Sequence, residues 1–235
     1  MKKALIIALL VVAAMPLLAA MAQMPQFGSA RQPAYTHVAR RYLERGAEEA
    51  GADNIVTGVI LNYRGFDTNG EVTVIFTACA AVCAVLASQR SSKEKGASGA
   101  TVPLSPVVAY VVRLLAPFIA LFAFYVVLFG ESSPGGGFQG GTIFAALVII
   151  LSVVTGREVA ERMLPGSVRP WLQIAGPLSF IVVGTLGAIL TGGYLGFPQT
   201  SKSLTTAMLM VIEFGIGVGG ATVFATIFWR LGDEL

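Results

Sequence analysis

The chain has 235 residues, of which 55% are hydrophobic and 12% are charged, and its formal net charge is +3. Because soluble domains carry about 25% charged residues, this composition and the mean hydropathy of +0.75 exclude an ordinary soluble domain and indicate a polytopic membrane protein. The positive charge is too small and too scattered for a nucleic-acid-binding protein, so we expect no nucleic-acid partner. Cys79 and Cys83 lie four residues apart in an apolar run, and His37 is the only histidine. We therefore expect no cofactor and no metal ligation.

Six apolar segments follow one another along the chain: 4–22, 72–87, 107–130, 138–156, 171–193 and 204–229. About 20 helical residues cross a hydrocarbon core of about 30 Å, so all but the second are long enough to span a membrane outright. The first segment also fits a cleavable signal peptide, because Lys2 and Lys3 precede an apolar run that ends in small residues. We expect it to be retained as an anchor. The predicted fold class is an all-α integral membrane protein with about six transmembrane helices.

Polar segments divide these helices. Residues 89–105 are rich in Ser, Lys, Gly and Pro and are typical of a linker. We therefore predict a two-helix segment over 1–90, a cytoplasmic linker over 91–105 and a four-helix domain over 106–235. Residues 35–50 predict a surface helix that ends at Gly46 or Gly51. Asp53 or Asn54 is placed to cap a short helix over 55–63, which is too short to cross a membrane and is expected at the interface.

The lysines and arginines are distributed unevenly between the two sides of the predicted bundle. The N-terminus, the second and fourth loops and the C-terminus hold nine of them, and the opposite side holds six, five of which lie in one long loop. Because short loops dominate the positive-inside rule, we expect both termini in the cytoplasm and the protein in the plasma (inner) membrane. The loop between the third and fourth apolar segments then faces outward.

That external loop reads Glu-Ser-Ser-Pro-Gly-Gly-Gly-Phe-Gln-Gly-Gly over residues 131–141. Five glycines and one proline in eleven residues do not continue a helix. Non-helical backbone at a membrane needs partners for its N–H and C=O groups, which only protein or a water-filled cavity supplies. We predict a packed loop shaped by Pro134, Gly135, Gly136 and Gly137, with Phe138 as an apolar plug. The alternative is a flexible turn.

Two charged residues, Arg113 and Glu213, lie inside the apolar segments. A charge in hydrocarbon costs at least about 2.5 kcal/mol, so such residues are functional candidates. Arg113 is six residues into the third segment and could snorkel to the cytoplasmic surface. Glu213 is nine residues into the last segment, which places it about 14 Å from the outer face and offset from Arg113 by about 7 Å. We expect Glu213 either to pair with Arg113 structurally or to be unpaired and carry a proton, and we favour the second.

Three further charges gather before the second apolar segment, in the run Arg64-Gly-Phe-Asp-Thr-Asn-Gly-Glu71. One interpretation is a solvated loop in which the one basic and two acidic groups neutralise one another. The other is that Glu71 binds or relays a cation beside Arg64. Glu131, at the end of the third segment, is either solvated or marks an ion entrance.

Two of these runs resemble known membrane proteins. Residues 54–71 resemble the C-terminal part of the large A subunit of Mrp (Mnh)-type multisubunit cation/proton antiporters, a part that is a separate E subunit in energy-converting hydrogenases. Residues 133–141 are similar to the signature of the antiporter B subunit, the F subunit of the hydrogenase-type complexes. With the spans around them, the matches cover most of residues 50–230. The chain resembles a B subunit fused after an E-like segment.

The resemblance implies functional positions in both motifs: Arg64, Asp67, Glu71, Pro134, Phe138 and Glu213. The first three match positions tied to ion translocation in the A subunit, and the others match the B signature and the acidic residue of its last span. The signature usually has a histidine near positions 131–132, where this chain has Glu131 and Ser132. The resemblance therefore implies no proton-transfer role for a histidine at this position of the chain.

By this resemblance the chain is a transport subunit without its own catalytic site. Its module would exchange a cation, expected to be Na⁺, for H⁺, and its partners would be other subunits of a large complex and the lipid bilayer. A separate E-like piece favours a redox-coupled respiratory host, such as a membrane-bound hydrogenase. The alternatives are a stand-alone antiporter complex, or a scaffold with no ion path of its own. An independent carrier is disfavoured because no inverted repeat is visible.

Overall fold

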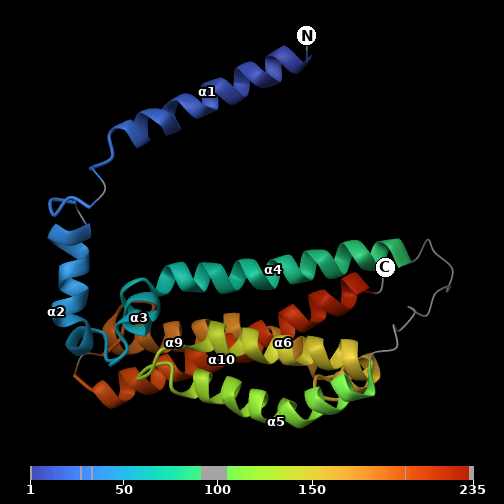
Figure 1. The fold of residues 1–235 in the computed structure, drawn as a ribbon. Helices are drawn as coiled ribbons and strands as arrows, with labels where there is room; N and C mark the ends of the chain where they lie inside the picture. The colour runs from blue at the N-terminus through green and yellow to red at the C-terminus, as the bar shows by residue number, and fades with distance from the viewer. Residues whose placement is uncertain (1, 27, 33, 91–104, 199, 233–235) are drawn as a thin grey trace. The chain divides into compact units, whose positions relative to one another are not determined.

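The fold comes from a computed structural model that describes residues 2–26, 28–32, 34–90, 105–198 and 200–232 (Figure 1). Within these residues the chain forms helices and no strand, so the prediction of an all-α protein is confirmed. The chain divides into two compact units, Met1–Glu44 and Arg45–Leu235. The predicted linker falls almost wholly outside the described residues, and the domain division there stays a prediction.

The first unit contains α1, Lys2–Ala22, and a π-helical turn, η1, Ala34–Val38. The helix α2, Ala39–Glu49, begins in this unit and ends in the second. The large apolar side chains of α1 are exposed, and the helix is long and apolar enough to cross a membrane. A helix with this surface is suited to contact lipid or other chains.

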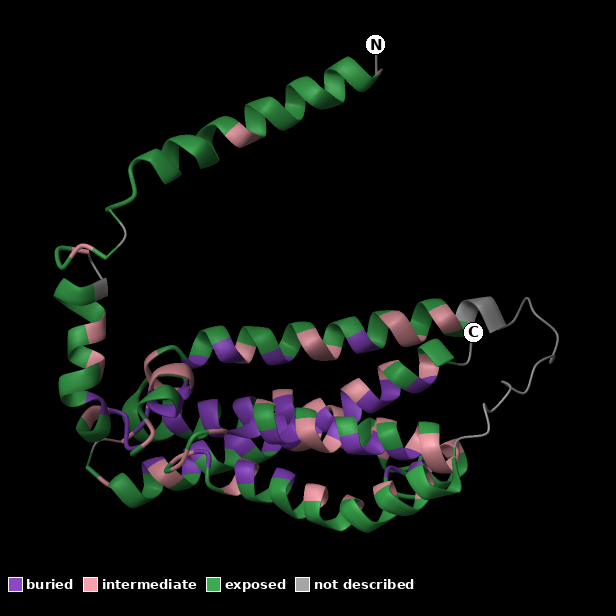
Figure 2. Ribbon diagram, viewed as in Figure 1, coloured by how far each residue is buried: buried purple, intermediate pink, exposed green. Residues whose placement is uncertain are grey.

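The second unit is a helical bundle built around its last helix, α10. Its long helices are α4, Gly65–Arg90; α5, Pro106–Leu128; α6, Gly137–Thr155; α9, Ala175–Thr191; and α10, Lys202–Gly232, with short α7, Arg157–Glu161, and α8, Arg169–Gln173. α10 contacts α4, α5, α6, α8 and α9. Figure 1 shows α4 and α5 on opposite sides of the bundle, and Figure 2 shows the buried residues concentrated on α6, α9 and α10.

Five helices are long and apolar enough to span a membrane: α1, α4, α5, α6 and α10. The sixth predicted span is shorter than expected, because the segment 171–193 is divided between α8 and the 17-residue α9. Pro177 lies in the first turn of α9, where its missing N–H removes no helical hydrogen bond. The second span starts earlier than predicted, at Gly65, so Glu71 lies within α4 and not in a loop.

Small residues bring the central helices into close contact. A side chain on Gly141 of α6 would place its Cβ 2.7 Å from the carbonyl oxygen of Gly217 on α10, so only glycine fits there. One core cluster, centred on Phe180, Leu209 and Ile212, joins α9 to α10. This is the packing expected where membrane helices approach through glycines.

The short helix before α4 is inserted into the bundle. Gly51 has a φ of +68°, and the surface helix therefore ends before it, at Glu49. Asn54 caps the next helix by accepting a hydrogen bond from the N–H of Val56. That helix runs as α3, Ile55–Thr57, and continues as a π-helix, η2, Gly58–Tyr63. Leu61 is fully buried, so this segment is part of the core and does not merely lie on the interface.

Candidate functional site

The glycine-rich loop after α5 is held by one asparagine. The Nδ2 group of Asn54 donates hydrogen bonds to the carbonyl oxygens of Gly130, at 2.9 Å, and Ser133, at 2.8 Å. The backbone N–H of Asn54 donates to the carbonyl oxygen of Glu131 at 2.8 Å. The loop therefore finds partners for its free carbonyl groups in the protein, as non-helical backbone in a membrane must.

Two glycines turn the chain into α6. Gly135 and Gly136 have φ values of +142° and +149°, a region that side chains rarely adopt. The helix begins directly afterwards at Gly137, and Pro134, immediately before the two glycines, is exposed. The two glycines thus turn the backbone so that α6 starts inside the bundle, with its first N–H group facing α10.

Glu213 of α10 lies directly against this turn. Its side chain is buried, with 3% of the residue exposed. The N–H of Gly137 donates a hydrogen bond to Oε2 of Glu213. A Cβ on Gly136 would lie 2.9 Å from both carboxylate oxygens, so the carboxyl group fills the space that glycine leaves open. The helix start offers a partial positive charge to the carboxyl group.

A threonine that sequence reasoning missed completes the site. Thr57 is fully buried at the end of α3. Its hydroxyl donates to the carbonyl oxygen of Gly130 at 2.6 Å and lies 3.5 Å from Oε1 of Glu213. The signal was its place three residues after the capping Asn54, which positions both side chains at one end of a short helix.

Of the two alternatives for Glu213, the structure does not support the ion pair with Arg113, which is the one we did not favour. Arg113 is exposed, and no ion pair within the described residues joins it to Glu213. The carboxyl group of Glu213 lies beside Gly130, beyond the end of α5, whereas Arg113 is 15 residues, or about 22 Å, before that end. The expected offset of about 7 Å between Arg113 and Glu213 is therefore not observed, and the depth of Glu213 in the membrane stays a prediction.

The charged run before the second span is not part of the Glu213 site. Arg64 and Asp67 form an exposed ion pair at 2.6 Å. Glu71 is exposed on α4, and Glu131 is half-exposed in the loop, with its carbonyl oxygen bound to Asn54. Within the described residues, no group of three or more His, Cys, Asp or Glu side chains is placed to hold a metal ion.

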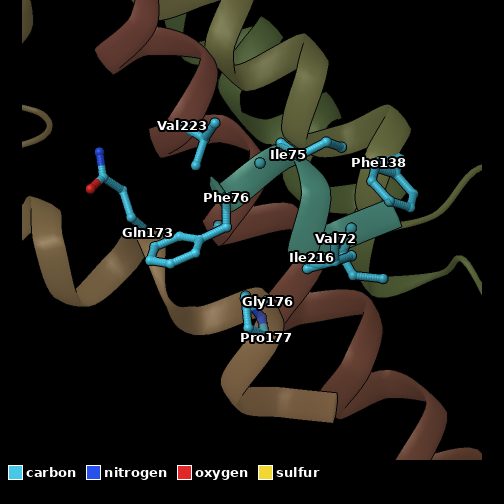
Figure 3. A pocket seen from close by; sticks show the side chains of 11 residues that line it. Val72, Ile75, Phe76, Phe138, Gln173, Gly176, Pro177, Ile216 and Val223 are labelled. Atoms are coloured by element: carbon cyan, nitrogen blue, oxygen red, sulfur yellow. The ribbon is translucent and has the colours of Figure 1, made fainter. Parts of the chain in front are cut away.

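Phe138 follows the turn and packs between helices. It contacts the core cluster around Phe180 and lines a small apolar pocket of about 20 Å³ between α4, α6, α9 and α10. Figure 3 shows Phe138 and Gln173 on opposite sides of this pocket. The lining of this pocket is apolar apart from Gln173.

A second, larger pocket of about 280 Å³ opens between α5, α6 and α10, with Leu164 and Leu172 at one end. Its lining is apolar apart from Thr222, whose hydroxyl is already bonded to the carbonyl oxygen of Val218 at 2.8 Å. The side chains that line this pocket can therefore contact an apolar group but provide no ligand for an ion.

Comparison with known proteins finds a match for each half of the chain. Residues 107–227, just over half of the chain, match the family described as "Domain related to MnhB subunit of Na+/H+ antiporter". Residues 2–100 match the MbhE family, which is described as the E subunit of MBH. The match to the MbhE family ends at residue 100, and the match to the MnhB-related family begins at residue 107.

Two curated relatives agree with these matches. The probable K⁺/H⁺ antiporter A/B subunit of Rhizobium meliloti (strain 1021) is 27% identical over 224 residues, covering 81% of this chain and 21% of that protein. The chain thus spans about a fifth of that relative. The Na⁺/H⁺ antiporter B subunit of Bacillus subtilis (strain 168) is 30% identical over 138 residues, covering 52% of this chain and 89% of the relative.

Two solved structures share the fold. A chain of the "membrane-bound sulfane sulfur reductase (MBS), an archaeal respiratory membrane complex" superposes with a TM-score of 0.70 at 30% identity, covering 98% of this chain and 97% of that one. A chain of the "Mrp complex from Dietzia sp. DQ12-45-1b" gives a TM-score of 0.69 at 23% identity, covering 99% of this chain and 26% of that one. On this evidence, the chain belongs to the family of domains related to the MnhB subunit of Na⁺/H⁺ antiporters, preceded by a segment that matches the MbhE family.

Proposed function

We propose that this chain is a transport subunit of an Mrp-type cation/proton antiport module, and that Glu213 is its exchangeable proton site. The observation that supports this most directly is the environment of Glu213. It is a buried carboxyl group in a membrane helix, it accepts a hydrogen bond from the N–H of Gly137, and no cation pairs with it within the described residues. A permanently charged carboxylate in this position would be costly, so a group that gains and loses a proton is favoured.

The exposed charged residues at the start of α4 are assigned a different role in this proposal. Arg64, Asp67 and Glu71 lie at the start of a helix that is apolar enough to span a membrane. Exposed charges there need water or a partner chain. We propose that they face the cation path formed with neighbouring subunits, with Glu71 as the cation-facing carboxylate and Glu131 at the entrance from the outer side.

The host and orientation complete the proposal. The relatives are antiporter subunits and a chain of a respiratory complex, and we favour a redox-coupled host with Na⁺ as the cation and no catalytic centre in this chain. We place both termini in the cytoplasm. Purification of the complex from solubilised membranes tests the host: iron–sulfur or nickel–iron subunits support the redox alternative, and antiporter subunits alone support the stand-alone alternative.

The experiment that tests the role of Glu213 is cation-driven proton movement in vesicles containing the assembled complex. Glu213→Gln removes the charge and keeps the shape, and we expect it to abolish transport while the complex assembles normally. The matched control is Glu158→Gln, which changes an exposed carboxylate on α7 and should transport like the wild type. Normal transport by Glu213→Gln would support a scaffold with no ion path of its own.

A further inference from the structure

The hydroxyl group of Thr57 has two acceptors within reach and only one proton to donate. It lies 2.6 Å from the carbonyl oxygen of Gly130 and 3.5 Å from Oε1 of Glu213. Because the first distance is that of a short O–H···O hydrogen bond and the second is at the limit of one, the proton points to Gly130 in this structure.

The carbonyl oxygen of Gly130 does not depend on that proton. Asn54 donates to the same oxygen from Nδ2 at 2.9 Å, and its second N–H covers Ser133 at 2.8 Å. The Asn54 contact to Thr57 Oγ1 is longer, at 3.1 Å, and would need a third hydrogen that the amide does not have. Thr57 can therefore redirect its proton without leaving a buried carbonyl unpartnered, and its oxygen is open to accept one.

We propose that Thr57 is a positioning residue that couples the protonation state of Glu213 to the hydrogen bonding of the glycine-rich loop. When Glu213 is protonated, its O–H donates to Thr57 Oγ1, and Thr57 donates to Gly130. When Glu213 loses its proton to the transport path, the Thr57 hydroxyl rotates and donates to Oε1, so that Gly130 keeps only its bond to Asn54. No covalent bond changes in Thr57, because its proton turns about the Cβ–Oγ bond.

This inference rests on the proposed function only for the claim that Glu213 changes its protonation. The elements packed against Glu213 are α3, the loop and α6, and their charged neighbours are few. Glu131 lies in the loop, and Asp53, before the cap, pairs with Lys202 at 2.8 Å. Lys202 is 11 residues, or about 16 Å, before Glu213 on α10. The described residues place none of the three in a hydrogen bond with Glu213.

The consequence is that the number of hydrogen bonds between the loop and the E-like segment changes when Glu213 gains or loses its proton. In the protonated state the 130–133 turn is tied to residues 54–57 by Asn54 and Thr57 together, and in the ionised state by Asn54 alone. The loop leads directly into Gly136 and Gly137, which contact the carboxyl group itself. Proton loss at Glu213 would therefore loosen the turn that contacts its own carboxyl group.

The test compares Thr57→Val, which keeps the shape and removes the hydroxyl, with Thr57→Ser, which keeps the hydroxyl. In infrared spectra of the assembled complex, the carboxyl C=O band that disappears in Glu213→Gln should shift in Thr57→Val and stay in place in Thr57→Ser. Hydrogen exchange of the 130–137 amides, corrected for intrinsic pH dependence, should differ about threefold to tenfold between the two states of Glu213, the size expected of one hydrogen bond. Thr57→Val should remove that difference.

An unchanged band and unchanged exchange in Thr57→Val would overturn the proposal. If Thr57→Val does not assemble, hydrogen exchange of the wild-type loop still tests the proposal. An exchange rate of the 130–137 amides that is the same in both protonation states of Glu213 would overturn it. A Glu213→Gln variant that transports normally contradicts the proposed function and leaves the spectroscopic result on Thr57 to be judged separately.

Discussion

The N–H of Gly137 donates a hydrogen bond to Oε2 of Glu213, which joins the first residue of α6 to a buried carboxyl group on α10. The glycine-rich motif and the acidic residue of the last span, 76 residues apart in the chain, therefore form one site. Thr57 brings the E-like segment into the same site through its hydroxyl. The two regions that resemble different subunits meet at one carboxyl group.

The first prediction concerns Gly136→Ala. The position has a φ of +149°, and a Cβ would lie 2.9 Å from both oxygens of Glu213. We expect a loss of roughly 1–3 kcal/mol in stability, measured as a lower Tm of the purified complex. Gly166→Ala is the control, because a Cβ there has open space and should leave the Tm unchanged. Equal Tm values for the two variants would mean that the turn adapts freely.

Asn54→Ala should loosen the glycine-rich loop. It removes the donor to the carbonyl oxygens of Gly130 and Ser133 and the cap of α3. We expect a cost of about 1–3 kcal/mol and faster hydrogen exchange over residues 130–137. Asn69→Ala on α4 serves as control, because the Asn69 side chain makes no hydrogen bond with the described residues and only its backbone carbonyl accepts one. If the loop already exchanges like a free linker in the wild type, its packing contributes nothing.

Arg64→Ala and Glu71→Ala should each impair ion coupling and leave assembly intact. The Arg64–Asp67 pair is exposed, and such pairs contribute about 0–1 kcal/mol. Transport in vesicles and gel filtration of the complex measure the two effects. Arg40→Ala, which breaks the exposed Arg40–Glu44 pair of α2, is the matched control. Failed assembly of either variant would show that the loop is structural, and normal transport by both would show that these residues have no part in coupling.

Phe138→Ala should destabilise the bundle and open the pocket beside it. Phe138 is half-buried against the core, and full burial would cost about 3–5 kcal/mol on truncation. We therefore expect a loss of about 1–3 kcal/mol, read as a fall in Tm. Phe118→Ala changes a ring that is 66% exposed on α5 and should cost less. Equal losses would contradict the packing role of Phe138.

The sequence was sufficient for the long apolar helices and for Glu213 and the glycine-rich motif of the site, but not for Thr57 or for the spatial relation of these residues. Hydropathy and composition predicted the spans, and the glycine and proline pattern predicted the break before α6. Counting residues along two separate helices did not give the distance between Arg113 and Glu213, because the relative position of α5 and α10 depends on tertiary packing. The structure leaves Glu213 without an ion pair to Arg113 within the described residues, which fits the unpaired alternative that we favoured.

Other features depended on tertiary contacts that local patterns do not encode. The run before the second span looked like a loop because of its Gly, Asp and Asn residues, yet packing extends α4 back to Gly65. The position of Thr57 three residues after the capping Asn54 is a weak signal, and only the fold reveals that this buried threonine lies between the loop and Glu213. Asn54 was predicted as a cap, but its two bonds to the loop join residues 76 and 79 positions away.

The central claim is that Glu213 exchanges a proton when a cation binds. Adding the cation to the purified complex in weakly buffered solution, with a pH-sensitive dye, measures the protons released. We predict release from the wild type and from Glu158→Gln, and its loss in Glu213→Gln with assembly unchanged. Equal proton release by Glu213→Gln and the wild type would contradict the account.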